Sequence, residues 1–312
     1  MSVRGSAQVT THHSFWDRDH EPVLAVMPGT TVEFVMSDPS GGQLSPTSTA
    51  ADLAELDLAS IPPIYGPVYV DGAEPGDALQ VKVVNLKIGD WGWTAVFPGF
   101  GLLEDEFPEP ALHIWQLDAA NLTPAEFAPG IKVPLHPFLG VMGVAPGEAG
   151  RHAVINPRHV GGNLDIRDLT VGSTLLLPVE VPGALFSCGD GHAAQGDGEV
   201  CGSALETPVT ATLRFDVIKQ ANLRMPRFVS QSPAIKRHLE HGYDVTCGVD
   251  ADLMTAARIA VGDMVDSLAA QTGMTRLDAY ILCSVCGDLR ISEIVDAPHW
   301  VVSFYLPRAV FV

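Results

Sequence analysis

Residues 209–218 read VTATLRFDVI and show the clearest alternation of apolar and polar side chains in the chain. Apolar residues occupy every odd position from 209 to 217, and polar residues fill the even positions from 210 to 216. Successive side chains of a strand point to opposite faces, so this pattern is typical of a half-buried β-strand. Three more alternating runs each follow a glycine turn: residues 31–36, 79–83 and 174–181. Their recurrence predicts a mainly β architecture.

The C-terminal third has a different pattern. Residues 251–271 carry apolar side chains at helical spacing, and Gly273 follows as an end signal. Thr275 opens a capping-box pattern for a short helix that we expect to run to about residue 285. Strands are predicted at residues 291–295 and 301–306. These elements form an α+β portion that begins near residues 226–233.

We therefore expect a mainly β fold with an α+β C-terminal part. Three regions are predicted: an N-terminal β-rich region (1–160), a central β region (161–225) and an α+β region (226–312). Three stretches rich in proline, glycine and serine are expected to be long loops: residues 37–48, 98–110 and 124–150. Long loops in a compact domain often form the walls of a site.

The composition indicates a globular protein that acts on small neutral molecules. The 312 residues include 37 acidic and 18 basic side chains, for a net charge of −19. This charge disfavours nucleic acid and anionic membranes as partners. No apolar run reaches the roughly 18 residues of a membrane span, and the first residues lack the apolar core of a secretory signal, so a cytoplasmic location is expected. The five cysteines, an odd number, favour a reducing compartment over a disulfide framework.

The densest group of chemically active residues lies in GALFSCGDGHAAQGDGEVCGSALE, residues 183–206. An apolar start, typical of a buried strand, leads into glycines interleaved with Asp190, His192, Asp197, Glu199 and Glu206. Residues two apart in an extended chain share a side, so Asp190 and His192 form one pair, and Asp197 and Glu199 are a candidate second pair. Such a pair can hold a divalent metal or act as an acid and a base. A solvated glycine–aspartate loop is the alternative.

A second candidate position is GGNLDI, residues 161–166. Asn163 and Asp165 are again two residues apart. The amide of Asn163 can donate a hydrogen bond to a carbonyl oxygen, and the carboxylate of Asp165 can bind a metal or act as a base. An ordinary turn before a strand is an equally good interpretation of these residue types.

Several motifs together resemble the acetamidase/formamidase family, whose members release ammonia from small aliphatic amides. The resemblance covers nearly the whole chain and includes the 183–206 stretch. It is also carried by PG (28–29), GGQ (41–43), GPVYV (66–70), GAEPGD (72–77), PGFGLL (98–103), GVMGVAP (140–146), GGNLD (161–165) and GDLRIS (287–292). It implies jelly-roll-like and barrel-like β regions intergrown in one compact unit, and a homo-oligomer, dimer or higher. Some relatives open small lactams, so the resemblance leaves the choice between linear amide and lactam open.

Amide hydrolysis gives the candidate residues hypothetical roles. Asp190 and His192 would be metal ligands or an acid–base pair, with Asp165 converging on them. Glu199 is the candidate proton shuttle, and Glu206 is a ligand or supports one. Asn163 and Gly191 are the candidate substrate-binding positions.

Oxygen and nitrogen ligands suit zinc, with calcium as a second option and Cys188 as a further candidate ligand. No Gly-x-Ser-x-Gly motif is present, and the sequence supplies no partner for Ser187, so a serine nucleophile is not supported. The alternative to an enzyme is a binding protein, a β-sandwich that binds a metal or another ligand without turnover. His192 argues against calcium, which prefers oxygen ligands.

Overall fold

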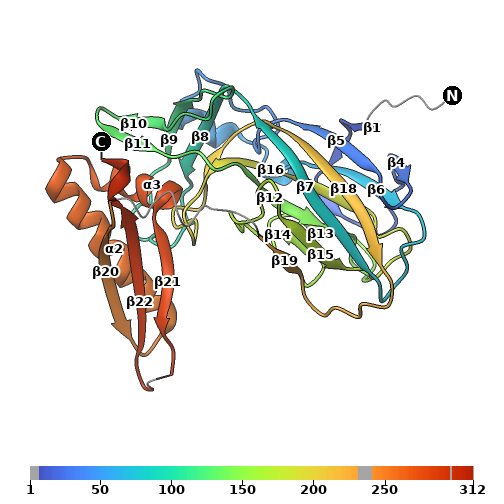
Figure 1. Ribbon diagram of the computed structural model, residues 1–312. Coiled ribbons are helices and arrows are strands. Elements are labelled where there is room, and N and C mark those ends of the chain that lie inside the picture. The colour runs from blue at the N-terminus through green and yellow to red at the C-terminus, as the bar shows by residue number, and fades with distance from the viewer. Residues whose placement is uncertain (1–6, 231–240, 296, 312) are drawn as a thin grey trace.

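Two large β-sheets form the body of the protein, and a smaller α+β module projects from one end of that body (Figure 1). The computed structural model describes residues 7–230, 241–295 and 297–311. The predicted mainly β architecture with a C-terminal α+β part is confirmed. No helix in the described part of the chain is long and apolar enough to cross a membrane.

The first sheet is built around the alternating stretch 209–218, which forms β18 and pairs antiparallel with β5 and β7. From Val209 to Asp216 its buried residues alternate with half-buried or exposed ones, as the pattern predicts. Across the sheet the strands are β1 (Ala7–Val9), β5 (Thr31–Met36), β18 (Val209–Ile218), β7 (Ala78–Ile88), β15 (Thr174–Pro178) and β19 (Arg227–Val229).

The second sheet carries the 183–206 stretch in its middle. Its main path runs through β14 (Gly161–Asn163), β12 (Phe138–Gly143), β16 (Phe186–Ala194), β17 (Leu205–Glu206), β8 (Trp91–Val96) and β9 (Ala111–Gln116). A branch attaches β6 (Ile64–Val70) to β16, with β2 (His12–His13) and β4 (Leu24–Val26) on β6. The short pairs β3–β13 (Phe15–Trp16 and His152–Ala153) and β10–β11 (Ala125–Ala128 and Ile131–Val133) complete the strands of the body.

Aromatic side chains from both sheets meet in the core. Phe34 on β5, Phe186 on β16 and Phe215 on β18 contact one another edge to face, with ring centroids 5.0–6.3 Å apart. All three side chains are fully buried. This contact fixes how β16, which carries the candidate site, lies against the first sheet.

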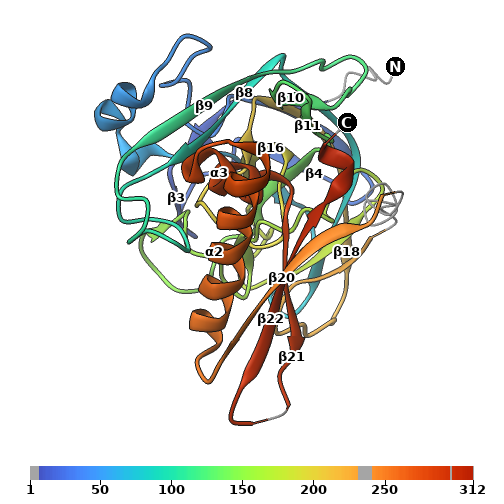
Figure 2. The same cartoon turned by 90° about the vertical axis from the view of Figure 1, so that its left-hand side faces the viewer.

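The C-terminal module has its own three-stranded sheet, ordered β20 (Tyr243–Asp250), β22 (Trp300–Pro307) and β21 (Asp288–Glu293). The helix α2 (Leu253–Thr272) lies along β20 and β22 (Figure 2). It ends at Gly273, which has φ 75° and donates its N–H to Ala269, as predicted. The second helix, α3 (Arg276–Cys286), begins with the predicted cap, in which the Thr275 side chain accepts from the N–H of Asp278. Short 3₁₀ turns occupy Ala50–Glu55, Leu58–Ser60 and Arg308–Val310.

Two sequence-based expectations about local structure were wrong. Residues 124–150 are not one long loop, because they contain β10, β11 and the buried strand β12. Their glycines and prolines suggest a loop, but the apolar run FLGVMG pairs with β14 and β16 on its two sides. The strand β20 was missed. Residues 231–233 of the predicted start of the α+β portion lie outside the described residues.

Candidate active site

Four neighbouring segments bring the predicted acidic residues and histidine together on one face of the second sheet. Asp190 and His192 lie on β16, and Glu206 lies on the adjacent β17, paired directly with His192. Asp165 follows β14 and donates its N–H to Gly140 on β12. We call Asp165, Asp190, His192, Glu199 and Glu206 the acid–histidine cluster.

The imidazole of His192 lies at the centre of this cluster. Its Nε2 atom is 2.9 Å from Oε2 of Glu206 and 3.4 Å from Oδ2 of Asp190. One ligand atom from each of these three residues lies within 4.8 Å of the other two. The same is true of a second group, which His192 forms with Asp165 and Glu199. The structure therefore places Asp165, and also Glu199, next to His192.

The backbone that presents three of the acids is unusual. Asp165, Asp190 and Glu199 have φ angles of 47°, 60° and 43°, in the left-handed region that residues with side chains seldom adopt. Such conformations persist only where the surrounding structure holds them, and they concentrate at functional sites. The strand pairing on both sides of β16 supplies this constraint at Asp190.

A glycine makes room for the cluster. A Cβ atom at Gly140 would lie 2.5 Å from Oδ1 of Asp165 and from Oδ2 of Asp190, and 3.0 Å from Cε1 of His192. The two carboxylates and the imidazole therefore enclose a space that any other residue at position 140 would fill.

Gln195 sets the tautomer of His192, a role that the sequence did not reveal. Its side-chain N–H donates to the backbone oxygen of Asp165 at 2.8 Å, so its Oε1 atom is left as an acceptor. That oxygen lies 3.0 Å from Nδ1 of His192, which must carry the proton of this contact. The Nε2 atom of His192 is thereby directed at Glu206 and Asp190.

The close packing of acids shifts their titration. Burial raises the pKa of Asp165 to about 7, and the charge of Asp190 adds to this shift. Burial and the charge of Asp165 raise the pKa of Glu199 well above its usual value, and burial also raises the pKa of Glu206. Burial alone lowers the pKa of His192, but Glu206 and Asp190 together raise it well above the usual value. The cluster therefore holds protons at neutral pH that isolated carboxylates would release.

The donor atoms fit a divalent cation. Within the described residues, Oδ1 of Asp165 is buried without a hydrogen-bond partner, and Nε2 of His192 faces the carboxylate oxygens of Glu206 and Asp190. Buried polar atoms are normally satisfied, and a cation bound among the imidazole and the carboxylates would satisfy them. An imidazole nitrogen with carboxylate oxygens is a ligand set that zinc accepts.

Other sequence-predicted residues lie elsewhere. Asn163 pairs with Val141, one position beyond Gly140, so the strand alternation directs its side chain to the opposite face of the sheet. Gly191 is a packing position, because an added Cβ would lie 2.7 Å from the backbone oxygen of Thr207. Asp197 and Glu199 do not form a pair, because they lie in a turn rather than a strand. Asp197 instead contacts Arg167 at 3.2 Å.

The sulfur and hydroxyl candidates also lie apart from the cluster. Cys188 is buried against Met36, and it is in neither ligand group of the described residues. Ser187 does have a partner that the sequence did not indicate, since Nε2 of His13 lies 3.0 Å from its Oγ atom. The Ser187 hydroxyl therefore contacts His13 and not the acid–histidine cluster.

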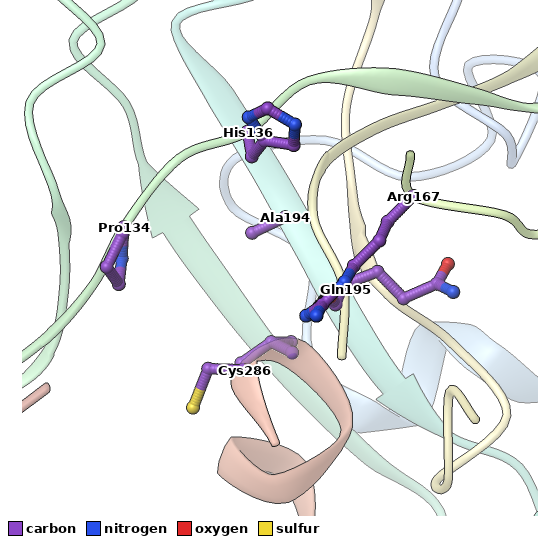
Figure 3. Close-up of a pocket in the computed structure, with 7 residues that line it drawn as sticks. Pro134, His136, Arg167, Ala194, Gln195 and Cys286 are labelled. Atoms are coloured by element: carbon purple, nitrogen blue, oxygen red, sulfur yellow. Dashed lines mark hydrogen bonds between the residues drawn. The ribbon is translucent and has the colours of Figure 1, made fainter. Parts of the chain in front are cut away.

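A small pocket borders the cluster on the side of the C-terminal module. It is lined by Pro134, His136, Arg167, Ala194, Gln195, Val285 and Cys286. Figure 3 shows the Arg167 side chain reaching toward Cys286, while the Gln195 amide points away from His136 and Pro134. The pocket therefore lies beside the residue that orients His192.

Comparison with known proteins identifies the family of the chain. The acetamidase/formamidase family model matches residues 2–154 and 147–312. A formamidase of Methylophilus methylotrophus is 27% identical over 364 residues, which cover 96% of this chain and 89% of that protein. Among solved structures, a gamma lactamase from Delftia acidovorans has a TM-score of 0.88 at 25% identity, covering 96% of this chain and 89% of that one.

An acetamidase from Bacillus halodurans has a TM-score of 0.68 at 30% identity, and the match covers 96% of each chain. The family model accounts for nearly every residue, including all members of the acid–histidine cluster. The chain therefore belongs to the acetamidase/formamidase family of amide hydrolases.

Proposed function

We propose that the acid–histidine cluster hydrolyses the C–N bond of small linear amides of the formamide and acetamide type. The observation that carries this proposal is the convergence of four carboxylates on one imidazole, with two of these carboxylates and the imidazole enclosing the space at Gly140. Family membership and the formamidase and acetamidase relatives support it. The net charge of −19 favours a neutral substrate over an anionic one.

Asp190, His192 and Glu206 are the residues that we propose to hold a divalent cation. Zinc suits the mixture of imidazole and carboxylate, whereas calcium prefers an all-oxygen set. A bound cation of this kind polarises an amide carbonyl group and lowers the pKa of water. Gln195 keeps the His192 ring in the tautomer and orientation that cation binding needs.

Asp165 and Glu199 are the residues that we propose to move protons. A pKa of about 7 allows the Asp165 carboxylate to take a proton from the attacking water near neutral pH. Burial raises the pKa of Glu199, which favours a protonated carboxyl group that can give a proton to the departing nitrogen. The products are then a carboxylic acid and ammonia.

A small lactam is the second candidate substrate. A lactam substrate is favoured by the overall fold, because the TM-score is 0.88 with the gamma lactamase and 0.68 with the acetamidase. Hydrolysis of a lactam breaks the same bond but releases an amino acid rather than ammonia. Homo-oligomeric assembly and a cytoplasmic location remain predictions.

A substrate panel tests the proposal. Purified protein is incubated with formamide, acetamide and 2-pyrrolidinone, and the release of ammonia or of a new primary amine is measured. Each assay is repeated after chelation and after return of zinc or calcium. We expect ammonia from the linear amides, loss on chelation and recovery with zinc. Amine release from the lactam alone would replace the linear-amide assignment. A protein that binds cation but cleaves no amide would be a binding protein.

A further inference from the structure

The loop that carries Glu199 is bonded to the C-terminal module as well as to the β body, where Leu102 donates its N–H to the backbone oxygen of Val200 at 2.8 Å. Gly196 donates its N–H to the backbone oxygen of Ser284 at 2.8 Å, and Leu289 donates to Asp197 at 2.9 Å. The N–H of Cys201 donates to the hydroxyl of Ser284 at 3.1 Å. Residues 196–201 are thus bonded at both ends to α3 and to the start of β21.

Arg167 joins this loop to the rest of the cluster. Its Nη1 atom lies 2.5 Å from Oδ1 of Asp288, at the start of β21, and its Nε atom lies 3.2 Å from Oδ1 of Asp197. Arg167 is 7% exposed and Asp288 is 1% exposed. In the chain, Arg167 follows Asp165 by two residues, and Asp197 precedes Glu199 by two. One buried guanidinium therefore ties together the two segments that present these carboxylates.

Arg167 lies beside the cluster, where its Nη1 atom also donates to the backbone oxygen of Gln195 at 3.4 Å. It is absent from the contacts of His192 with Asp190 and Glu206, which belong to β16 and β17 and are held by strand pairing. Asp165 and Glu199 lie outside the strands, in segments with positive φ. Asp165 is bonded to Gly140 on β12, whereas the segment of Glu199 takes no part in the strand pairing, so the separation of the two carboxylates also depends on contacts outside the sheet.

We propose that Arg167 is a positioning residue, which uses Asp288 and Asp197 to hold Glu199 at its working distance from Asp165. The proposal rests on the proposed function, in which these two carboxyl groups move the protons of amide hydrolysis. A planar guanidinium can bind both partners at once, whereas a lysine ammonium acts as a single point charge.

The first experiment compares Arg167→Lys and Arg167→Met with Arg290→Met. Arg290 also pairs with Asp288, at 3.0 Å, but it does not contact Asp197 and its side chain is 40% exposed. We expect kcat on acetamide to fall about 100-fold in Arg167→Met and by less in Arg167→Lys, with KM nearly constant. Arg290→Met keeps its kcat. Zinc affinity stays unchanged in all three, because Asp190, His192 and Glu206 remain in place.

A double-mutant cycle then tests whether Arg167 acts through Glu199. If it does, adding Arg167→Met to Glu199→Gln lowers kcat little further, since the residue being positioned is already inactive. Hydrogen exchange at residues 196–201 should speed up in Arg167→Met and stay unchanged in β18. This readout does not depend on turnover.

Chemical rescue closes the test. Arg167→Ala should regain activity with millimolar guanidinium, which can reach its place through the adjoining pocket, and Arg290→Ala should not respond. The proposal is overturned if Arg167→Met folds and keeps kcat within twofold, or if it loses zinc together with activity. Failure of the wild-type protein to cleave any amide would instead overturn the proposed function, while the exchange data would still report on the positioning of the loop.

Discussion

Nδ1 of His192 lies 3.0 Å from Oε1 of Gln195, and this contact decides which nitrogen of the imidazole faces the carboxylates. The amide cannot rotate to offer its N–H to His192 without losing its bond to the backbone oxygen of Asp165. A residue three positions after the histidine therefore controls its chemistry. Nothing in the local pattern HAAQ indicates this role, because it depends on where Asp165 lies in the folded chain.

Replacing Gln195 by leucine should weaken cation binding without unfolding the protein. The variant leaves Nδ1 of His192 without its acceptor, so the ring can turn away. We expect zinc affinity, measured by titration calorimetry, to fall about 10- to 100-fold. An affinity within twofold of the wild type would show that Gln195 does not orient the ring.

Gly140→Ala should abolish cation binding and amide hydrolysis while the fold survives. The added methyl group would lie 2.5 Å from carboxylate oxygens of Asp165 and Asp190 and would fill the space between them. The φ angle of Gly140 is not positive, so alanine itself is tolerated by the backbone. Zinc titration and the ammonia assay measure the loss, and circular dichroism checks the fold. Normal zinc binding would contradict the proposed location of the cation.

Two glycines of the C-terminal module should respond in opposite ways to alanine. A Cβ at Gly248 on β20 would collide with the backbone oxygen of Ala256, so α2 would have to move away from the sheet. Gly248→Ala should cost about 1–3 kcal/mol of unfolding free energy or more. Gly262, within α2, has no neighbour closer than 4.0 Å, and Gly262→Ala should stabilise by about 0.5–1 kcal/mol. Urea unfolding measures both, and equal effects would contradict the packing described.

The stability of the protein should fall between about pH 6.5 and pH 4 in part because of His13. Burial lowers the pKa of His13 to about 4. The neighbouring His20 and His12 also lower this pKa, and the hydrogen bond to the backbone of Phe15 partly offsets the shift. The unfolded chain therefore binds a proton in this range that the folded protein excludes, so stability is lost as the pH falls. His13→Gln should show a smaller drop in Tm from pH 7 to pH 4. The exposed His299→Gln is the control, and an unchanged drop in His13→Gln would exclude this contribution.

The sequence predicted those strands and helices in which the spacing of apolar residues matches the spacing of buried side chains. The strand at 209–218 and both helices follow from alternation, a helical stripe and cap residues. β20 was missed because its sequence, YDVTCGVD, carries no clean alternation and leaves most of its side chains half-buried or exposed. β12 was missed because it contains glycines, which usually indicate a loop. These glycines instead allow close contacts with other segments: Gly140 lies against the cluster, and Gly143 lies against Gly162.

Some residues of the candidate site could also be predicted from local sequence patterns, and others could not. Asp165, Asp190, His192, Glu199 and Glu206 were identifiable because acids and glycines are dense in two short stretches. Gln195 and Arg167 were not, because their roles come from partners far along the chain. The face on which Asn163 lies could not be predicted, because spacing alone does not show which face of a strand lies toward the site.

The most direct test of the account is the rate of ammonia release from acetamide by Glu199→Gln, with zinc bound and the fold intact. The amide of glutamine keeps the size of the side chain but cannot carry the proton that the departing nitrogen needs. We predict a fall in kcat of about 100-fold or more, with zinc affinity unchanged. A variant that releases ammonia at the wild-type rate would contradict the assignment of the acid–histidine cluster as the centre of amide hydrolysis.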